Sequence, residues 1–306
     1  LESGADSIAP GYGFLSENAE FAARCEKEGI VFVGPSAEVI TMFGDKLQAK
    51  AFAKECGVPV INGSDEALPT AEAMAEFVSS ANLRLPLMLK AANGGGGRGM
   101  RVVEAMDELA EAFERCSSEA AVAFGSGAVF VEEYLATVRH IEIQVLGDGT
   151  GEAIHLYERD CSVQRRNQKM IEIAPSRGMD PGLRQRMTDA ALALASKSNY
   201  RGAGTVEFLL EGSLDDPQAN FFFLEVNPRL QVEHTVTEQV TGVDLVQAIL
   251  SICAGSTLAD LGLTQDAIAL QGFAIQSRVT VEPSAEYMIT AYSEPTGPGV
   301  RVDAAG

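Results

Sequence analysis

The chain has 306 residues, a net charge of −20 and a pI of about 4.5. A general nucleic-acid-binding protein needs a basic surface, so this class is excluded, and an anionic ligand must meet local positive groups on an acidic body. No run of about 18 apolar residues is present, which excludes a transmembrane helix. The five cysteines are widely spaced and form no zinc-type pair, so we expect structural thiols in a reducing compartment. The first residues lie in the middle of an expected element, so we expect the natural N-terminus to be missing.

Residues 1–45 alternate between short apolar runs and amphipathic segments. Consecutive strand and helix units predict parallel strands with helices packed on them. We interpret this segment as part of an N-terminal α/β domain, with Ser16 as the cap of its first helix. The expected strands lie at 5–10 and 30–33, and the expected helices at 16–28 and 34–42.

Residues 60–134 read as a small β-α-β-β-α-β module, preceded by a helix that begins at Lys46 and ends near residue 56. We interpret the module as a lid. The expected strands lie at 57–60, 85–91, 100–104 and 128–134, and the expected helices at 66–82 and 106–123. Lys90 lies in the second of these strands, and Glu132 lies near the end of the last.

The sequence Asn-Gly-Gly-Gly-Gly-Arg-Gly-Met at 93–100 formally matches G-x-G-x-x-G. We reject a dinucleotide-binding interpretation, because a strand and not a helix follows the glycines. A glycine loop between two strands favours a hairpin whose backbone N–H groups fold over phosphates. A plain linker is the alternative, but Lys90 just before the loop and Arg98 within it favour phosphate contact.

The chain becomes strand-rich from residue 139. Strands at 140–146 and 153–161, joined by a glycine-rich turn, predict a hairpin. The next segment, 162–169, carries three cations in eight residues. A solvated loop is the ordinary interpretation of such a run, but its apolar flanks and the acidic body favour an anion site. A helix is expected at 180–199.

Two apolar strands carry acidic side chains, at 202–210 and from residue 221 onward. Glu225 and Asn227 alternate with Val226 and therefore point to one face. If the strands are antiparallel, Glu207 and Glu225 meet, and with Asn227 they form an oxygen set suited to Mg²⁺ with phosphates. A solvated sheet face is the alternative, but the strands are too apolar for it.

After Pro228 the chain continues with hydrogen-bonding and charged groups, although burying such groups is costly unless they are paired. We therefore expect this stretch to belong to an active site. An apolar helix is expected at 243–254, a strand with Arg278 at 270–281, and loop and strand at 295–302.

Together these motifs resemble the biotin carboxylase component of biotin-dependent carboxylases, which are ATP-grasp enzymes. The resemblance runs in order through the whole chain, although the family's first βαβ segment and much of its C-terminal subdomain are absent. It implies a mixed α/β and α+β fold with a partial N-terminal domain (1–45), an ATP-grasp domain (46–255) with a mobile lid at about 60–134, and a partial C-terminal subdomain (256–306). The motifs are P-G-Y-G-F-L-S-E-N (10–18), G-G-G-G-R-G-M-R-V-V (94–103), R-H-I-E-I-Q-V (139–145), E-R-D-C-S-V-Q-R-R-N-Q-K (158–169), R-G-A-G-T-V-E-F (201–208) and E-V-N-P-R-L-Q-V-E-H-T-V-T-E (225–238).

The resemblance implies ATP-driven carboxylation of biotin on a carrier domain, in which bicarbonate attacks the γ-phosphate to give carboxyphosphate. The cofactors implied are ATP, Mg²⁺ or Mn²⁺ and carrier-bound biotin, with bicarbonate as substrate. Glu233 matches the base that deprotonates bicarbonate, and Arg278 matches the group that stabilises the biotin enolate. Arg229, Gln231, Val232 and Lys169 match the bicarbonate pocket, and Glu207, Glu225 and Asn227 match the metal ligands. Nucleotide contacts are matched by Lys46, Lys90, Gly95, Gly96, Gly97, Glu132, Leu135, His140 and Gln164.

The sequence departs from the family pattern at Ala9 and Asn167, where histidine is common, and in a short segment between Val281 and Ala291. The implied partners are a biotin carboxyl carrier domain, a carboxyltransferase domain or subunit, and further copies of the chain, with neither nucleic acid nor membrane. We expect the final acceptor to be an acyl-CoA or pyruvate, with urea as the alternative. Another ATP-grasp ligase and a non-catalytic ATP-binding domain are the competing functions. The expected location is the cytoplasm or an organellar matrix, with the mitochondrion included.

Overall fold

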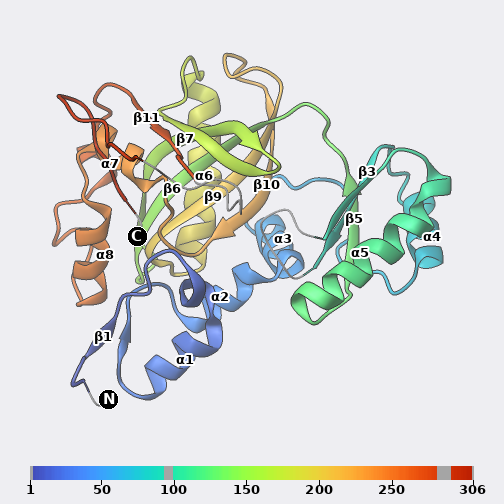
Figure 1. Ribbon diagram of the computed structural model, residues 1–306, viewed down its shortest axis with the longest axis horizontal. Helices are drawn as coiled ribbons and strands as arrows, with labels where there is room; N and C mark the ends of the chain where they lie inside the picture. The colour runs from blue at the N-terminus through green and yellow to red at the C-terminus, as the bar shows by residue number, and fades with distance from the viewer. Residues whose placement is uncertain (1–2, 93–98, 281–290, 305–306) are drawn as a thin grey trace.

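The computed structural model describes residues 3–92, 99–280 and 291–304. Figure 1 shows three parts, which we call the N-terminal unit (3–45), the lid (61–134) and the body (46–60 and 135–304). The lid projects to one side of the body, and α3 (Lys46–Glu55) of the body lies between them (Figure 1). The predictions for Gly95, Gly96 and Gly97 and for the short segment after residue 280 lie outside the described residues.

The N-terminal unit confirms the predicted parallel strands. The strands β1 (Ser7–Ile8) and β2 (Val31–Phe32) pair in parallel, and α1 (Ala19–Lys27) and α2 (Ala37–Gly44) accompany them. The predicted cap of the first helix was wrong. Ser16 is buried within a 3₁₀ turn, η1 (Phe14–Glu17), and the Asn18 side chain accepts a hydrogen bond from the Phe21 backbone N–H at 2.7 Å. The extra turn moves the helix start beyond Ser16.

The lid is a three-stranded antiparallel sheet of order β4-β3-β5, covered by two helices (Figure 1). Its own apolar cluster includes Met74, Leu89, Phe113 and Val131. The lid elements are α4 (Ala71–Ser80), β3 (Leu87–Ala91), β4 (Met100–Val103), η2 (Met106–Glu108), α5 (Leu109–Phe124) and β5 (Val129–Glu133).

The strand expected at 57–60 is not formed. Val60 makes only an isolated parallel bridge to Phe223. Pro59 lacks a backbone N–H and cannot donate to a ladder, although its carbonyl accepts from the Phe223 backbone N–H at 2.8 Å. This segment is therefore a connection between body and lid.

The body is built on a six-stranded sheet of order β10-β9-β6-β7-β8-β11, in which every neighbouring pair is antiparallel. The strands are β6 (Arg139–Asp148), β7 (Ala153–Arg165), β8 (Gln168–Ala174), β9 (Arg201–Glu211), β10 (Asn220–Asn227) and β11 (Ala274–Ser277). The helices are α3 (Lys46–Glu55), α6 (Pro181–Lys197), α7 (His234–Thr241), α8 (Leu245–Cys253) and η3 (Gln265–Ala267).

Two segments of the body differ from the expected strands. β7 continues to Arg165, beyond the end expected at residue 161, and β8 begins at Gln168 within the cationic segment 162–169. Only Arg166 and Asn167 form the turn, with φ of +53° and +61°. Two positive φ values are typical of the type I′ turn, a common two-residue connection of a hairpin. The strand expected at 295–302 is not formed within the described residues 291–304.

Strand alternation divides the sheet into an apolar face and a polar face. Ile141, Ile143 and Val145 of β6 are buried in the main apolar cluster, together with residues of α6. The residues that alternate with them, His140, Glu142 and Gln144, point to the opposite face. Acidic and amide groups of a central strand are thereby placed on the face that carries the site.

All five cysteines are free thiols, and Cys25, Cys116 and Cys161 are buried. Within the described part of the chain, no helix is long and apolar enough to cross a membrane.

Candidate active site

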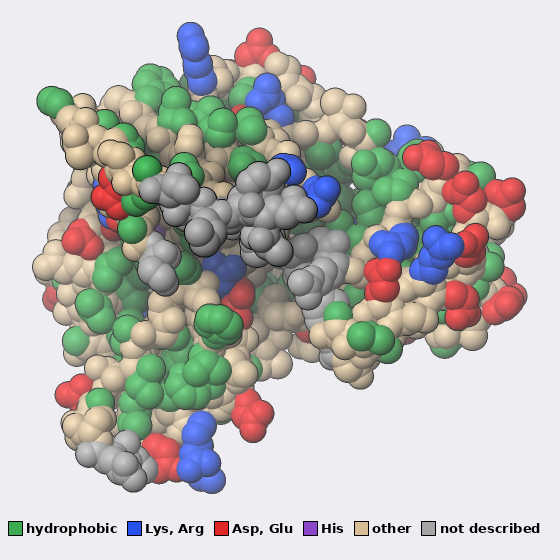
Figure 2. Space-filling view, in the orientation of Figure 1, with side chains coloured by type: hydrophobic (Ala, Val, Ile, Leu, Met, Phe, Trp, Pro, Cys, Tyr) green, Lys and Arg blue, Asp and Glu red, His purple; other side chains and the backbone are tan. Residues whose placement is uncertain are grey.

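A cavity of about 820 Å³ lies between the lid and the polar face of the body sheet. In the space-filling view, Lys and Arg side chains gather along the hollow between these two parts (Figure 2). Each predicted site residue that the structure describes lines this one cavity. These residues are Lys46, Lys90, Glu132, Leu135, His140, Gln164, Lys169, Glu207, Glu225, Asn227, Arg229, Gln231, Val232, Glu233 and Arg278.

The centre of the site is a row of charged residues across four adjacent strands. Glu225 of β10 pairs in register with Glu207 of β9, which pairs with Glu142 of β6, which pairs with Arg159 of β7. Directly opposed residues in antiparallel strands place their side chains on the same face. The sequence-based expectation that Glu207 and Glu225 meet is thus confirmed by the register.

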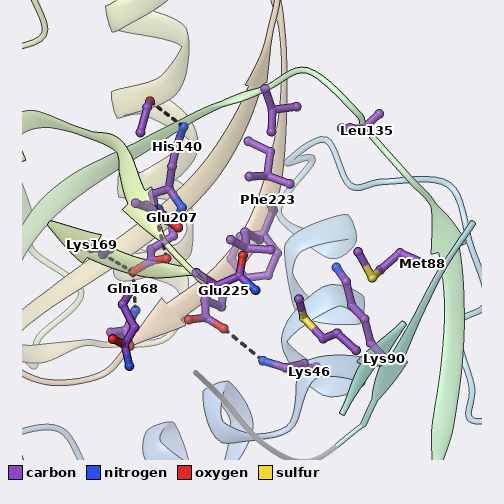
Figure 3. Close-up of a pocket in the computed structure, with 18 of the residues that line it drawn as sticks. Lys46, Met88, Lys90, Leu135, His140, Gln168, Lys169, Glu207, Phe223 and Glu225 are labelled. Carbon is purple, nitrogen blue, oxygen red and sulfur yellow. Dashed lines mark hydrogen bonds and ion pairs between the residues drawn. The ribbon is translucent and has the colours of Figure 1, made fainter. Parts of the chain in front are cut away.

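Lys169 of β8 lies among three buried carboxylates from three different elements. Its ammonium donates to Glu207 at 2.7 Å and to Glu233 at 2.9 Å, and it also contacts Glu142. Figure 3 shows Lys169 and Glu207 directed toward one another. The His140 Nε2 atom lies 2.8 Å from the second oxygen of Glu207. Three further charged or titratable groups, Glu142, Glu233 and His140, therefore surround the pair of Glu207 and Lys169.

The pKa values in this cluster follow from burial and pairing. Burial would raise the pKa of Glu142, but the Lys169 and Arg159 cations outweigh it and lower the pKa to about 2. For Glu207, burial is likewise outweighed by Lys169 and His140, so its pKa lies well below the usual range. Burial would lower the pKa of Lys169, yet the carboxylates raise it well above its ordinary value. Glu142 and Glu207 are therefore ionised and Lys169 is protonated at neutral pH.

The stretch after Pro228 leaves the sheet instead of extending it. Gln231 is buried and donates to Glu207 at 3.1 Å. Arg229 donates to the Asn227 side-chain oxygen at 3.2 Å and also pairs with Glu17 of the N-terminal unit. Glu233 occupies the N-cap position of α7. The loop between β10 and α7 thus carries the predicted bicarbonate residues to the edge of the carboxylate cluster.

Arg278, directly after β11, closes the opposite side of Glu233. Its guanidinium donates to Glu233 at 2.7 Å and to Glu172 of β8 at 2.6 Å. Burial raises the pKa of Glu172 despite the nearby Arg278 cation. Glu233 therefore lies between two cations, since Lys169 contacts its other oxygen.

A second group of charges marks the lid end of the cavity. Glu132 accepts from Lys90 at 2.6 Å and from Lys50 of α3 at 2.9 Å. Burial would raise the pKa of Glu132, but Lys90 and Lys50 lower it. Lys46 pairs with Glu225 at 3.0 Å, as the dashed line in Figure 3 shows. Figure 3 also shows Lys90 pointing from the lid toward the cavity.

Not all of the predicted residues contact one another. The Gln164 side chain donates to the backbone carbonyl of Cys161 at 2.9 Å, and Val232 is 38% exposed at the mouth of the cavity. Leu135 lines the cavity from the connection that leaves the lid.

Four charged residues of the site, Lys50, Glu142, Arg159 and Glu172, were not predicted from the sequence. Glu142 carried a usable signal, because it alternates with His140 in an otherwise apolar strand and must share its face. For Arg159, neighbouring polar residues on β7 masked that signal.

The residues predicted to hold a metal fit a divalent cation that also binds phosphates. Glu207 and Glu225 are directly opposed, and the Asn227 amide lies within hydrogen-bonding distance of Glu207, at 2.8 Å. Hard oxygen donors of this kind suit Mg²⁺. In the tighter group of His140, Glu142 and Glu207, both carboxylates already contact the Lys169 ammonium, which makes that group a poorer candidate.

Residues 45–261 match the family model described as carbamoyl-phosphate synthase L chain, ATP binding domain, and residues 1–40 match that of the biotin carboxylase N-terminal domain. The chain belongs to the biotin carboxylase family. It is 51% identical over 309 residues to pyruvate carboxylase of Schizosaccharomyces pombe and 51% identical over 307 residues to that of Bacillus subtilis. These alignments cover 99% and 97% of this chain but 26% of each relative, so the chain spans about a quarter of their length.

Solved biotin carboxylases have the same fold. A biotin carboxylase from Campylobacter jejuni superposes with a TM-score of 0.86 at 45% identity, covering 93% of this chain and 61% of that one. The biotin carboxylase domain of 2-oxoglutarate carboxylase from Hydrogenobacter thermophilus, solved with MgADP, ADP and bicarbonate, gives a TM-score of 0.84 at 44% identity and covers 91% and 59%. The expected ATP-grasp biotin carboxylase fold is thereby confirmed.

Proposed function

We propose that this chain carboxylates biotin on a carrier domain, using ATP and bicarbonate through carboxyphosphate. The observation that carries the proposal is that three groups line one cavity. They are lysines suited to bind phosphate, oxygen ligands suited to bind a divalent metal, and Glu233 with its neighbouring cations. Family membership and the bicarbonate and MgADP bound to the Hydrogenobacter relative support it. The reaction would be the first half-reaction of a biotin-dependent carboxylase.

Phosphoryl transfer is achieved mainly by positioning and by neutralising charge. Lys46 and Lys90 supply positive charge at the lid end of the cavity, and Glu132 fixes the Lys90 ammonium. Glu207, Glu225 and Asn227 would hold Mg²⁺ or Mn²⁺, which neutralises phosphate oxygens when bound. We assign contacts with the nucleotide to Leu135, His140 and Gln164, which line the same cavity.

The bicarbonate side uses residues beyond Pro228. Glu233 accepts the bicarbonate proton, and its position between Lys169 and Arg278 orients its carboxylate. Arg229, Gln231 and Val232 position the anion. Arg278 meets negative charge that develops on biotin, because a guanidinium fixed beforehand stabilises such charge without reorganisation.

A variant that replaces the carboxylate of the base by an uncharged amide tests this assignment. In the full-length protein, Glu233→Gln should lower bicarbonate-dependent ATP cleavage in the presence of biotin by at least about 100-fold, which is the lower end for loss of a general base. MgATP binding, measured by calorimetry, should stay within about twofold. Glu211→Gln makes the same change at the exposed end of β9 and serves as the control. Loss of MgATP binding in Glu233→Gln would show that the metal and bicarbonate roles do not divide at Pro228.

We further infer that the final acceptor is pyruvate or an acyl-CoA. The relatives compared here include pyruvate carboxylases, and none of them favours the urea alternative. We propose a biotin carboxyl carrier domain, a carboxyltransferase region and further copies of the chain as partners. The mouse relative is mitochondrial by name, which supports an organellar matrix as one location and leaves the cytoplasm as the other. Carboxylation assays of the full-length protein with pyruvate, acetyl-CoA and urea separate these acceptors.

A further inference from the structure

Arg159 of β7 is a fully buried arginine that no step of the proposed reaction uses. Its exposed fraction is 0%. The five N–H groups of a guanidinium are all donors, and each of them has an acceptor here. The acceptors are Glu142 at 2.5 Å, Gln144 at 2.6 Å, Gln231 at 2.8 Å, Thr237 at 2.9 Å and Thr205 at 3.1 Å.

Three of these contacts lead directly to the bicarbonate side of the site. The guanidinium holds the carbonyl oxygen of Gln231, so the amide N–H₂ of that side chain faces Glu207. It also holds Thr237 of α7, the helix for which Glu233 is the N-cap. Arg159 therefore fixes both ends of the segment that carries Gln231 and Glu233.

The third contact runs through Glu142. One oxygen of Glu142 accepts from Arg159, and the other contacts the Lys169 ammonium. Because Glu142 cannot turn away from the guanidinium without leaving buried charge unpaired, Lys169 is held in place toward Glu233. The connection to the nucleotide side is less direct. Among the described residues neither Lys46 nor Lys90 is a hydrogen-bond partner of Arg159, and Glu207 of the metal set is reached through Gln231 and Lys169.

We propose that Arg159 is a positioning residue for the bicarbonate pocket, which it aligns by holding Gln231, α7 and the Glu142–Lys169 pair in one arrangement. The inference rests on the proposed function and deepens it. A planar guanidinium suits this task, because it stays charged and presents its donors in a rigid fork. A lysine offers one flexible point charge and reaches fewer of the same acceptors.

The test compares substrate dependence in the full-length protein. Arg159→Lys keeps the charge, Thr237→Val removes one acceptor with little change in shape, and Arg159→Met removes the charge. The matched control is Arg184→Met, because Arg184 pairs at 2.8 Å with Glu158, a buried carboxylate on the neighbouring position of β7. Arg184 is not among the residues that line the cavity.

We expect Arg159→Lys to raise the KM for bicarbonate and lower kcat by at least about tenfold each, since misplacement of reacting groups by about 1 Å costs up to about 100-fold. The Kd for MgATP should stay within about twofold. Thr237→Val should shift the same two parameters in the same direction by a smaller factor. Arg184→Met should leave the ratio of the KM for bicarbonate to the KM for MgATP at the wild-type level, even if it lowers the melting temperature.

The possible failures are distinguishable. A wild-type protein without bicarbonate-dependent ATP cleavage overturns the proposed function and this inference with it. If the wild type is active, two results overturn the inference alone. In the first, Arg159→Lys is as active as wild type; in the second, it weakens the binding of MgATP and of bicarbonate by the same factor. An Arg184→Met variant with the same selective rise in the KM for bicarbonate also overturns it. If Arg159→Met does not fold, Arg159→Lys and Thr237→Val still decide the outcome.

Discussion

Replacing Lys169 by methionine should strongly destabilise the polar face of the body sheet. The ammonium is the common partner of Glu142, Glu207 and Glu233, and its side chain is 12% exposed. Removing one partner of a buried ion pair costs about 3–5 kcal/mol. Each carboxylate keeps a second cationic or titratable neighbour in Arg159, His140 or Arg278. We therefore expect the lower end, about 3 kcal/mol.

Hydrogen exchange measured by mass spectrometry can locate this loss within the full-length protein. A change of about 3 kcal/mol corresponds to roughly 100-fold faster exchange of the most protected amides, here those of β6 and β9. Lid peptides from β3 and β5 should exchange at the wild-type rate, because the lid has its own apolar cluster. Lys169→Arg, which keeps the charge, is the control and should lose less.

The effect should also depend on pH. In the wild type, Lys169 contributes to lowering the pKa values of Glu142 and Glu207. In Lys169→Met this contribution is lost and burial raises both values, so protonation relieves the repulsion. The difference between variant and wild type should therefore shrink from about pH 8 to about pH 5. A difference below about 1 kcal/mol at neutral pH, or one that grows on acidification, would refute the reasoning.

Two further predictions concern the lid and acid stability. Lys90→Met should weaken MgATP binding by about 10-fold to 100-fold, which corresponds to the loss of a hydrogen bond to a charged group. The control Lys54→Met removes an exposed ion pair with Asp65 and should bind MgATP as the wild type does. Equal binding by both variants in calorimetry would contradict the assignment of Lys90. Because the pKa of Glu142 in the folded protein lies below its ordinary value of 4.5, its stabilising contribution is present above pH 4.5 and is lost as the pH falls toward about 2. Glu142→Gln should thus be less stable at neutral pH but lose stability less steeply between these values in acid unfolding followed by circular dichroism, and an unchanged slope would count against the pKa assignment.

Much of the site could be predicted because side-chain alternation is local. The spacing of Glu225 and Asn227 put both on one face, and antiparallel pairing brought Glu207 to them. The contacts made by Arg278 and Lys169 could not be obtained in this way. Both residues reach Glu233 across segments far apart in the chain, and only the family resemblance pointed to them.

The errors in the fold came from short-range signals that longer-range pairing overrode. The cationic segment 162–169 lacks an apolar pattern, but its ends pair across a tight turn at Arg166 and Asn167. Residues 57–60 are apolar, yet Pro59 and the nearby β10 limit them to a single bridge. Arg159 escaped notice because its five acceptors come from three other elements and a loop, which no local pattern reveals.

The apolar cluster of the lid and the main apolar cluster of the body lie on either side of the cavity and share no residue within the described chain. The lid cluster draws only on residues 68–131, whereas the main body cluster joins residues 39–60 to residues 141–226. During synthesis from the N-terminus, where domains fold as units once they are complete, the lid can close its core as soon as Val131 has emerged. Residues 39–60 must wait until β10 has been made. The lid should therefore fold on the ribosome before the body that flanks it on both sides in the sequence.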